Sequence, residues 1–209
     1  MNRAPLLYSA VVLAIISFGI GYSAGSAGLP GVGGLQGIGP AASEDGISCY
    51  FSPHGGCTEA VVAEIEKAQH EIDVQAYSYT SEPIMQALVA AHRRGVNVTV
   101  VLDRSELKER GNKAEETQRG GVRVLVDSVH KIAHNKIILI DGHTIITGSF
   151  NFTFQAENYN AENLLVLHDR PKLYAAYKAN FEHHLGHSEP YEEKEREKEP
   201  ARQAERGRR

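Results

Sequence analysis

The sequence predicts an α/β fold in which a mixed β-sheet is flanked by helices on both faces. Short β-branched runs, such as Val96–Leu102 (VNVTVVL), alternate with amphipathic segments of helical length, and this alternation is typical of α/β domains. Several of these runs are apolar at successive positions, which indicates central strands that are buried on both faces.

Length and composition allow one folded domain with appendages. The chain has 209 residues, of which 42% are hydrophobic and 23% charged, so a packed core is expected and global disorder is excluded. The formal charge of −4 gives no overall attraction to nucleic acid or anionic lipid. Two cysteines exclude both a disulfide-dense scaffold and a four-cysteine zinc site within one chain.

The N-terminal part carries no charge between Arg3 and Glu44. Its apolar run, residues 4–20, is intermediate in length between a signal peptide and a membrane span, so residues 1–27 are interpreted as a signal peptide or an uncleaved membrane anchor. A soluble core helix is the third alternative, although it would show a polar face. Residues 28–43 are rich in glycine and are predicted to form a tether.

The folded domain is predicted to span residues 44–188, without internal repeats. Residues 189–209 follow as a charged tail, helical or disordered, whose acidic and basic residues balance. In the first half of the domain, hydrophobic spacing predicts strands at Ile47–Ser52, Ile72–Tyr79 and Val96–Leu102, a helix at Thr58–Gln69, and a second helix capped by Ser81, with Pro83 in its first turn, that stops at Gly95.

The second half is predicted from the same signals. Asp141-Gly142 is a favoured hairpin-turn dipeptide and separates two apolar runs. The expected elements are a loop with a short helix in Arg104–Arg119, strands at Val122–Val126, Lys136–Ile140, Thr144–Thr147 and Leu164–Leu167, and a final amphipathic helix at Leu173–Leu185.

The chemistry is concentrated in residues 134–151, HNKIILIDGHTIITGSFN. His134 and Lys136 are two residues apart at the start of a predicted strand, so their side chains leave the same face. Ser149 and Asn151 follow the next strand. An imidazole that attacks phosphorus, with an ammonium, a hydroxyl and an amide to hold the charged oxygens, suits a phosphodiester substrate.

This pattern, H-x-K-x4-D-x6-G-S-x-N, resembles the signature of the phospholipase D superfamily, and His134, Lys136, Asp141, Gly148, Ser149 and Asn151 match every position. With one copy in a small domain, the chain is most similar to short bacterial nucleases and mitochondrial single-motif members of that superfamily. The resemblance extends to Phe51-Ser52-Pro53, to residues 76–81 and to Glu162-Asn163. It implies a phospholipase D-like fold with one such motif per chain.

The resemblance also implies roles for individual residues. His134, Lys136, Asp141 and Glu162 form the catalytic set, in which Asp141 has a structural, pairing role and Glu162 orients and charges a catalytic histidine. Lys136, Ser149 and Asn151 bind the phosphate. Each residue also has an ordinary explanation, such as a turn for Asp141 or a surface acid for Glu162, but these explanations would all have to coincide.

A count of histidines predicts the assembly. Covalent cleavage needs one histidine as nucleophile and a second, protonated one for the leaving oxygen, yet no other histidine has a lysine two residues later. In the superfamily two motifs pair across a pseudo-twofold axis. A homodimer with a shared active site is therefore expected, with no cofactor and no metal, because the lysines stabilise the charge.

The remaining histidines and the cysteines give weaker signals. His183 and His187 have metal-ligand spacing, but cations also favour a helix C-terminus. Cys49, His54 and Cys57 supply only three zinc ligands. In an exported protein a Cys49–Cys57 disulfide is the preferred interpretation.

The substrate is expected to be nucleic acid, DNA or RNA, because the compact domain has no extra element for a lipid. Hydrolysis of membrane phospholipid such as phosphatidylcholine is the alternative, favoured by a possible membrane attachment, and a non-catalytic phosphate-binding module is the third. An extracytoplasmic or membrane-anchored location is expected from the N-terminus. A basic groove and a solvated face explain equally well the residues Arg93, Arg94, Arg104, Lys108, Arg110, Lys113 and Arg119.

Overall fold

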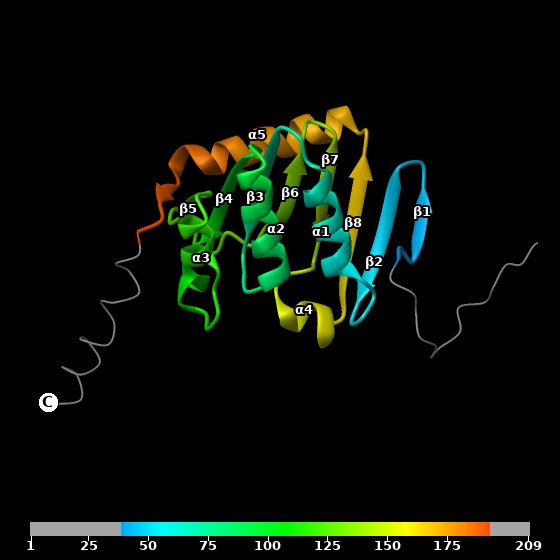
Figure 1. Cartoon of the computed structure of the whole chain (residues 1–209), viewed down its shortest axis with the longest axis horizontal. Coiled ribbons are helices and arrows are strands. Elements are labelled where there is room, and N and C mark those ends of the chain that lie inside the picture. Colours follow the sequence, from blue (N-terminus) through cyan, green and yellow to red (C-terminus); the bar gives the residue numbers. More distant parts are fainter. Residues whose placement is uncertain (1–38, 193–209) are drawn as a thin grey trace, which may run out of the picture. The chain divides into compact units, whose positions relative to one another are not determined.

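The computed structural model describes residues 39–192 (Figure 1). The predicted signal peptide or anchor at 1–27, most of the tether and most of the charged tail lie outside the described residues. Among the residues that are described, no helix has both the length and the apolar character needed to cross a bilayer.

One nine-stranded sheet runs through the described part of the chain, in the order β1-β2-β8-β7-β6-β3-β4-β5-β9. β3, β4 and β5 are parallel to one another, and the neighbouring pairs on either side are antiparallel. The mixed sheet is confirmed. Its strands are β1 (Ala42–Glu44), β2 (Ile47–Ser52), β3 (Glu71–Ala76), β4 (Asn97–Asp103), β5 (Arg123–Asp127), β6 (Lys136–Ile140), β7 (Thr144–Gly148), β8 (Glu162–His168) and β9 (Glu189–Pro190).

Helices cover both faces of the sheet, as predicted. In Figure 1, α1 and α2 lie in front of the sheet and α5 crosses behind it. The elements are α1 (Cys57–Lys67), α2 (Glu82–Arg93), the short 3-10 helix η1 (Ser105–Lys108), α3 (Ala114–Arg119), α4 (Phe154–Asn158) and α5 (Pro171–His187).

The central strand β6 shows why both faces must be apolar. All five of its residues are buried. Ile138 and Ile140 belong to the larger core with α1 and α2, whereas Leu139 belongs to the smaller core with Tyr174 and Phe181 of α5. Because successive side chains of a strand point to opposite faces, a continuous apolar run is what a two-sided core requires.

The predicted boundaries are close to the observed ones. The single short helix predicted in Arg104–Arg119 is two helices, η1 and α3, and three further short elements are additional. β1 begins at Ala42, inside the predicted tether, and β9 lies in the predicted tail, where it pairs with β5. The third is α4, whose first residue follows Thr153, and the Thr153 hydroxyl accepts a hydrogen bond from the Ala156 amide (3.0 Å). Ser81 does precede α2, but its side chain makes no capping hydrogen bond.

Candidate active site

Strand register brings the motif residues other than Asp141 to one end of the sheet. Ala76, the last residue of β3, pairs with Lys136, the first residue of β6. Ile137 pairs with Thr147 at the end of β7, and Gly148 pairs with Leu164 near the start of β8. His134, Lys136, Ser149 and Glu162 therefore meet at the edge where β6 and β8 begin, the lower edge in Figure 1.

His134 lies on an exposed loop immediately before β6. Its ring packs on Tyr77, with centroids 4.4 Å apart and planes inclined by 55°. The preceding residue is fixed, because the Ala133 amide donates to Asp103 Oδ2 at 2.5 Å. The imidazole is thus held on one side and open to solvent on the other.

Lys136 is buried beside that imidazole and is only 5% exposed. Its Nζ lies 2.9 Å from His134 Nδ1 and 2.8 Å from the His134 carbonyl oxygen, which accepts a hydrogen bond from it. Nζ also lies 4.9 Å from the centre of the Tyr77 ring. Burial lowers the pKa of Lys136 to about 8, although the negative charges of Glu162, Asp103 and Glu106 act in the opposite direction.

Ser149 and Asn151 follow β7 at the same edge. The exposed Ser149 hydroxyl accepts hydrogen bonds from the Asn163 amide (3.1 Å) and from Asn163 Nδ2 (3.2 Å). Asn151 keeps a buried side-chain oxygen that has no hydrogen-bond partner. An unpaired buried acceptor is costly in a finished structure, so it is consistent with a site that is completed by a ligand or by another chain.

Asp141 lies at the opposite end of β6 from Lys136, ~17 Å away for a five-residue strand. Its carboxylate accepts three backbone hydrogen bonds, from Gln69 (2.7 Å), His70 (2.8 Å) and Glu71 (2.8 Å). Burial acts to raise the pKa of Asp141, but these three donors outweigh it and lower the pKa. Through these hydrogen bonds Asp141 joins the β6–β7 turn to the start of β3, which supports the predicted structural role.

Glu162 is the first residue of β8 and is partly exposed. Its Oε1 accepts a hydrogen bond from Asn160 Nδ2 at 3.1 Å. Within the part of the chain described, it makes no hydrogen bond to His134, so the orienting role of Glu162 stays a prediction. Its charge does reach Lys136, whose pKa it acts to raise.

The predicted Cys49–Cys57 disulfide is wrong: both thiols are free. Cys49 is two residues from Ile47 on β2 and pairs with Leu165, whereas Tyr50, on the other face of the strand, packs on the core that contains Cys57. The two cysteines thus face opposite sides of the sheet. Burial also raises the pKa of the Cys57 thiol to about 12, which makes this thiol unreactive.

Two sets of residues were not recognised from sequence. The first is Tyr77 directly after β3, Asp103 at the end of β4 and Glu106 in η1, which surround His134 and Lys136. The second is a cluster of four potential metal ligands, formed by Asp127, His130, His184 and His187. Among the histidines, only His183 and His187 have metal-ligand spacing in the sequence, and no metal is predicted there; of these two, His187 belongs to the cluster and His183 does not. Long-range pairing brings the members of both sets together, and residue spacing does not reveal that pairing.

For the basic residues, a groove and a solvated face are equally good explanations from sequence alone, and the structure gives three of them intramolecular partners. Arg94 donates to the Ile65 and Glu66 carbonyl oxygens at the end of α1, and Lys113 pairs with Glu82 and Glu116. Arg119 pairs with Glu115 at 2.5 Å. These three side chains therefore have intramolecular partners, and a solvated face explains them better than a groove.

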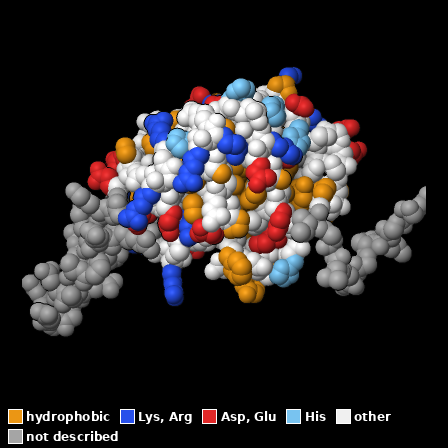
Figure 2. Space-filling model, in the orientation of Figure 1, with side chains coloured by type: hydrophobic (Ala, Val, Ile, Leu, Met, Phe, Trp, Pro, Cys, Tyr) orange, Lys and Arg blue, Asp and Glu red, His pale blue; other side chains and the backbone are white. Residues whose placement is uncertain are grey.

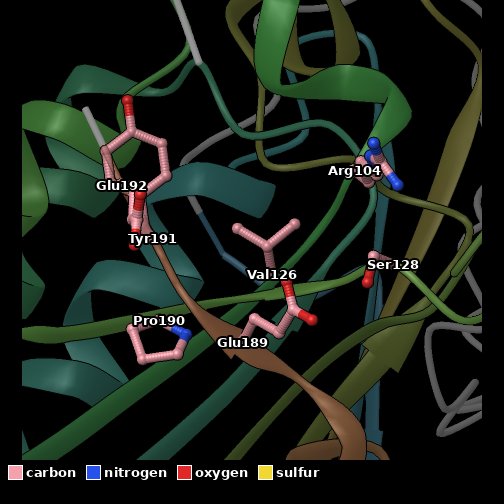
Figure 3. A pocket seen from close by; sticks show the side chains of 7 residues that line it. All are labelled: Arg104, Val126, Ser128, Glu189, Pro190, Tyr191 and Glu192. Atoms are coloured by element: carbon pink, nitrogen blue, oxygen red, sulfur yellow. The ribbon is translucent and has the colours of Figure 1, made fainter. Parts of the chain in front are cut away.

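A cavity of about 350 Å³ lies beside β5 and β9 (Figure 3). None of the motif residues lines it. The side chains that surround it are Arg104, Val126, Ser128, Glu189, Pro190, Tyr191 and Glu192. The candidate site around His134 and Lys136 therefore lies outside this cavity.

Comparison with known proteins gives concordant results. Residues 61–185 match the family described as "Cardiolipin synthase, PLD-like domain". A Rickettsia prowazekii protein named phospholipase D is 45% identical over 139 residues, which are 66% of this chain and 67% of the relative. A Chlamydomonas reinhardtii protein named mitochondrial cardiolipin hydrolase is 31% identical over 134 residues, 64% of this chain and 60% of the relative.

Solved structures have the same fold. Nuc from Salmonella typhimurium, described as a phospholipase D family member, is similar with a TM-score of 0.67 and 35% identity, and the match covers 69% of this chain and 97% of Nuc. NucT from Helicobacter pylori matches with a TM-score of 0.64, 19% identity, and coverage of 69% of this chain and 98% of NucT, which supports the fold alone.

Proposed function

This chain belongs to the phospholipase D superfamily and is a phosphodiesterase hydrolase, and from that premise we propose that His134 is its nucleophile. The observation that supports this most directly is the contact of 2.9 Å between Lys136 Nζ and His134 Nδ1 at an open edge of the sheet. It pairs an imidazole that can attack phosphorus with an ammonium that can hold the oxygens of the phosphate.

In the proposed first step, an imidazole nitrogen of His134 bonds to phosphorus while the bond to the leaving oxygen breaks. The partner subunit's His134, which is protonated, transfers its proton to that oxygen. In the second step this neutral imidazole takes a proton from water, the water oxygen bonds to phosphorus, and the phosphorus–nitrogen bond breaks. Lys136, Ser149 and Asn151 of both subunits hold the phosphate oxygens.

The second histidine is assigned to a second chain because this chain offers no clear candidate. Among the described residues, His134 makes its ring contact with Tyr77 and with no other histidine. His130, the nearest in sequence, is hydrogen-bonded to Asp127. A homodimer with a shared site would also supply partners for the buried Asn151 oxygen.

For the substrate we propose nucleic acid. His134 and Ser149 are exposed at the edge of the sheet, where a polymer can pass over them without entering an enclosed cavity. The match covers 97% of the Nuc chain, which supports the proposal that the compact domain needs no additional domain for its activity, apart from a second copy of itself.

Phospholipid is the second candidate, favoured by an exposed aromatic group near the same edge. Phe51 on β2 is 55% exposed, Phe154 on α4 60% and Tyr159 73%. Figure 2 shows hydrophobic side chains projecting at the lower edge, where α4 lies in Figure 1. Exposed aromatic side chains can insert into a membrane interface, and the curated relatives are named after lipid hydrolysis.

One experiment tests the chemistry and the substrate together. Single-stranded DNA, RNA, phosphatidylcholine vesicles and cardiolipin vesicles, each labelled at the phosphate, are mixed with the protein and quenched in base, because phosphohistidine is labile in acid. We expect a labelled protein with nucleic acid, none with His134→Asn, and normal labelling with His70→Asn, which removes an exposed histidine away from the site.

The contrary outcomes are also specific. Full turnover by His134→Asn would remove the proposed nucleophile. Labelling by vesicles alone, lost when Phe154 and Tyr159 are both changed to Ser, would replace nucleic acid by phospholipid as the substrate.

For the cell we propose a location outside the cytoplasm, or attachment to the membrane through residues 1–27. The apolar run in that segment supports this proposal. The cysteines give it no support, because both thiols are free. Cell fractionation of the full chain should place it in the membrane or extracytoplasmic fraction. Recovery from the cytoplasm would contradict the proposal.

A further inference from the structure

A second group of side chains with metal-binding chemistry lies outside the candidate active site. Asp127 is the last residue of β5, and His130 follows in the loop that leads to His134. His184 and His187 are three residues apart in the last turn of α5 and so share one side of the helix. Three separate segments thus bring one carboxylate and three imidazoles together.

The ligand atoms of these four residues all lie within 4.8 Å of one another. Asp127 Oδ2 is 2.7 Å from His184 Nδ1, 3.0 Å from His130 Nδ1 and 3.2 Å from His187 Nε2. In a tetrahedral zinc site with bonds of 2.0–2.2 Å, neighbouring ligand atoms lie about 3.3–3.5 Å apart. Small side-chain movements would therefore convert this cluster into a coordination sphere.

The cluster contains a buried carboxylate, that of Asp127, whose negative charge a bound cation would stabilise. The Asp127 side chain is completely buried, and His184 is nearly so. Asp127 Oδ1 accepts hydrogen bonds from the backbone amides of Val129 (3.1 Å) and His130 (3.4 Å), whereas Oδ2 lies within hydrogen-bond distance of all three rings. A buried negative charge needs a positive partner. Among the residues that the structure describes, no lysine or arginine forms an ion pair with Asp127.

The three imidazole rings also lie close to one another. The centroid of His130 lies 4.8 Å from that of His184 and 5.2 Å from that of His187, and the last two are 5.3 Å apart. All three rings converge on the same carboxylate oxygen, and a metal ion at that point would use all three through their neutral lone pairs.

We propose that Asp127, His130, His184 and His187 bind one divalent transition-metal ion, for which Zn²⁺ is the best fit. The set has four ligands, and nitrogen with carboxylate oxygen is a donor combination that zinc takes. His130 has a side chain 40% exposed, so an ion can enter from solvent.

The proposed ion would be structural and would position the catalytic loop. It would join the end of β5 and the end of α5 to the loop that carries His134, four residues beyond His130. This loop is held at its other end by the hydrogen bond from Ala133 to Asp103. Ser128 directly follows Asp127, and Glu189 lies two residues after His187. Both line the same cavity in Figure 3, so the two segments already lie together.

The test uses the full chain in mild detergent, without a polyhistidine tag and without chelating resin, because either would confuse metal content. Metal content is measured by mass spectrometry, and chelator-treated protein is then titrated with Zn²⁺ while the unfolding temperature is followed. We expect one equivalent of zinc and a rising Tm, because an ion that binds only the folded state stabilises it.

Matched variants locate the site. His130→Gln and His187→Gln should weaken zinc binding by more than about tenfold. His183→Gln should leave it unchanged, because His183 is exposed on the same turn of α5 but is not among the four ligands. Titration of the wild type with Co²⁺ needs no variant, and it should give the strong visible absorption of a four-coordinate ion.

Two results would overturn the proposal. One is wild-type protein that binds no stoichiometric zinc or cobalt and shows no change of Tm, which would leave a hydrogen-bonded cluster. The other is zinc binding that survives in both His130→Gln and His187→Gln, which would place the ion elsewhere. Neither result bears on the labelling of His134, so this proposal and the proposed function fail separately.

Discussion

The reactivity of the candidate site depends on the contact between the side chains of His134 and Lys136. Lys136 donates to the His134 carbonyl oxygen and contacts His134 Nδ1, and it is buried while His134 is open to solvent. The cost of burying the ammonium lowers the pKa of Lys136 to about 8. A bound phosphate would offset the free-energy cost of this burial, because it gives the ammonium a counter-ion.

Activity should therefore decline on the alkaline side near pH 8. As Lys136 loses its proton, the phosphate loses its main cation, and kcat/KM should fall about tenfold per pH unit above the pKa. The measurement is kcat/KM from pH 6 to pH 10, with circular dichroism to verify folding. The fold should persist, since a lysine whose pKa is lowered by folding makes the protein more stable as pH rises from about 8 toward 10.5. A flat profile to pH 10 would show that the ammonium is not needed.

For Asp141, in contrast to Lys136, we expect an effect on stability and not on activity. Asp141→Ala removes an acceptor for three backbone amides and should lower the free energy of unfolding by about 2 kcal/mol, with kcat of the folded fraction nearly unchanged. Urea unfolding with active-site titration measures both quantities. Because folding lowers the pKa of Asp141, its contribution is present above the unfolded pKa, near 3.8, and is lost as pH falls through the folded one. The difference between variant and wild type should shrink in that acid range, and a large loss of kcat at full stability would contradict the structural role.

Residues that are close in sequence were predictable, and residues joined only by the fold were not. His134 and Lys136 lie two apart on a strand, so their proximity follows from strand geometry. Asp127 and His184 are 57 residues apart and meet only because α5 ends beside β5. The assignment of Cys49 to a disulfide failed for the same reason, because eight residues of sequence separation do not reveal which face of the sheet each thiol occupies.

At the level of elements, strong periodicity decided which predictions succeeded. β6 and α2 carry clear apolar patterns, and their predicted positions agree with the structure to within two residues. β1, β9 and α4 have two to five residues each, too few for any period to show. β9 even contains Pro190, which is tolerated because it lies at the edge of the sheet.

Gly148 is the last residue of β7, directly before Ser149, which we propose to bind phosphate, and a side chain does not fit at this position. Its φ of 146° lies in a region that side chains disfavour, and a Cβ there would lie 2.3 Å from the Asn163 carbonyl oxygen. That oxygen accepts hydrogen bonds from the Ser149 and Phe150 amides. We expect Gly148→Ala to separate β7 from β8 at this point and to displace Ser149.

The expected result for Gly148→Ala is a loss of unfolding free energy of about 1–3 kcal/mol together with a rise in KM, because a phosphate ligand moves. Urea unfolding and steady-state kinetics measure the two effects. Gly142→Ala is the matched control: its φ of 79° is also positive, but nothing lies within 4 Å of the added Cβ, so it should affect stability without affecting KM. Equal KM values in the two variants would contradict the role of Gly148 in the site.

At the scale of the whole molecule, the presence of a single motif in the chain is the strongest argument for a homodimer. The chain folds one complete sheet with helices on both faces, yet His134 has no second imidazole beside it within the described residues. A homodimer with a shared site would require a chain of this kind, which has a stable fold and supplies one of the two catalytic histidines. The overall fold follows from one chain, whereas the proposed chemistry needs two.

A mixed dimer tests this directly. A heterodimer of wild type and His134→Ala holds two sets of phosphate-binding groups but one histidine, so it can form the covalent intermediate and cannot protonate the leaving oxygen efficiently. General acid catalysis is typically worth about 10²–10⁴-fold, and the specific activity should fall by that order, far beyond the twofold loss expected for independent sites. The measurement is the activity of a heterodimer purified through two different affinity tags, with light scattering to establish the dimer. Half of the wild-type activity, or an active monomer, would mean that one chain carries a complete site, and His130 or His168 would then have to donate the proton.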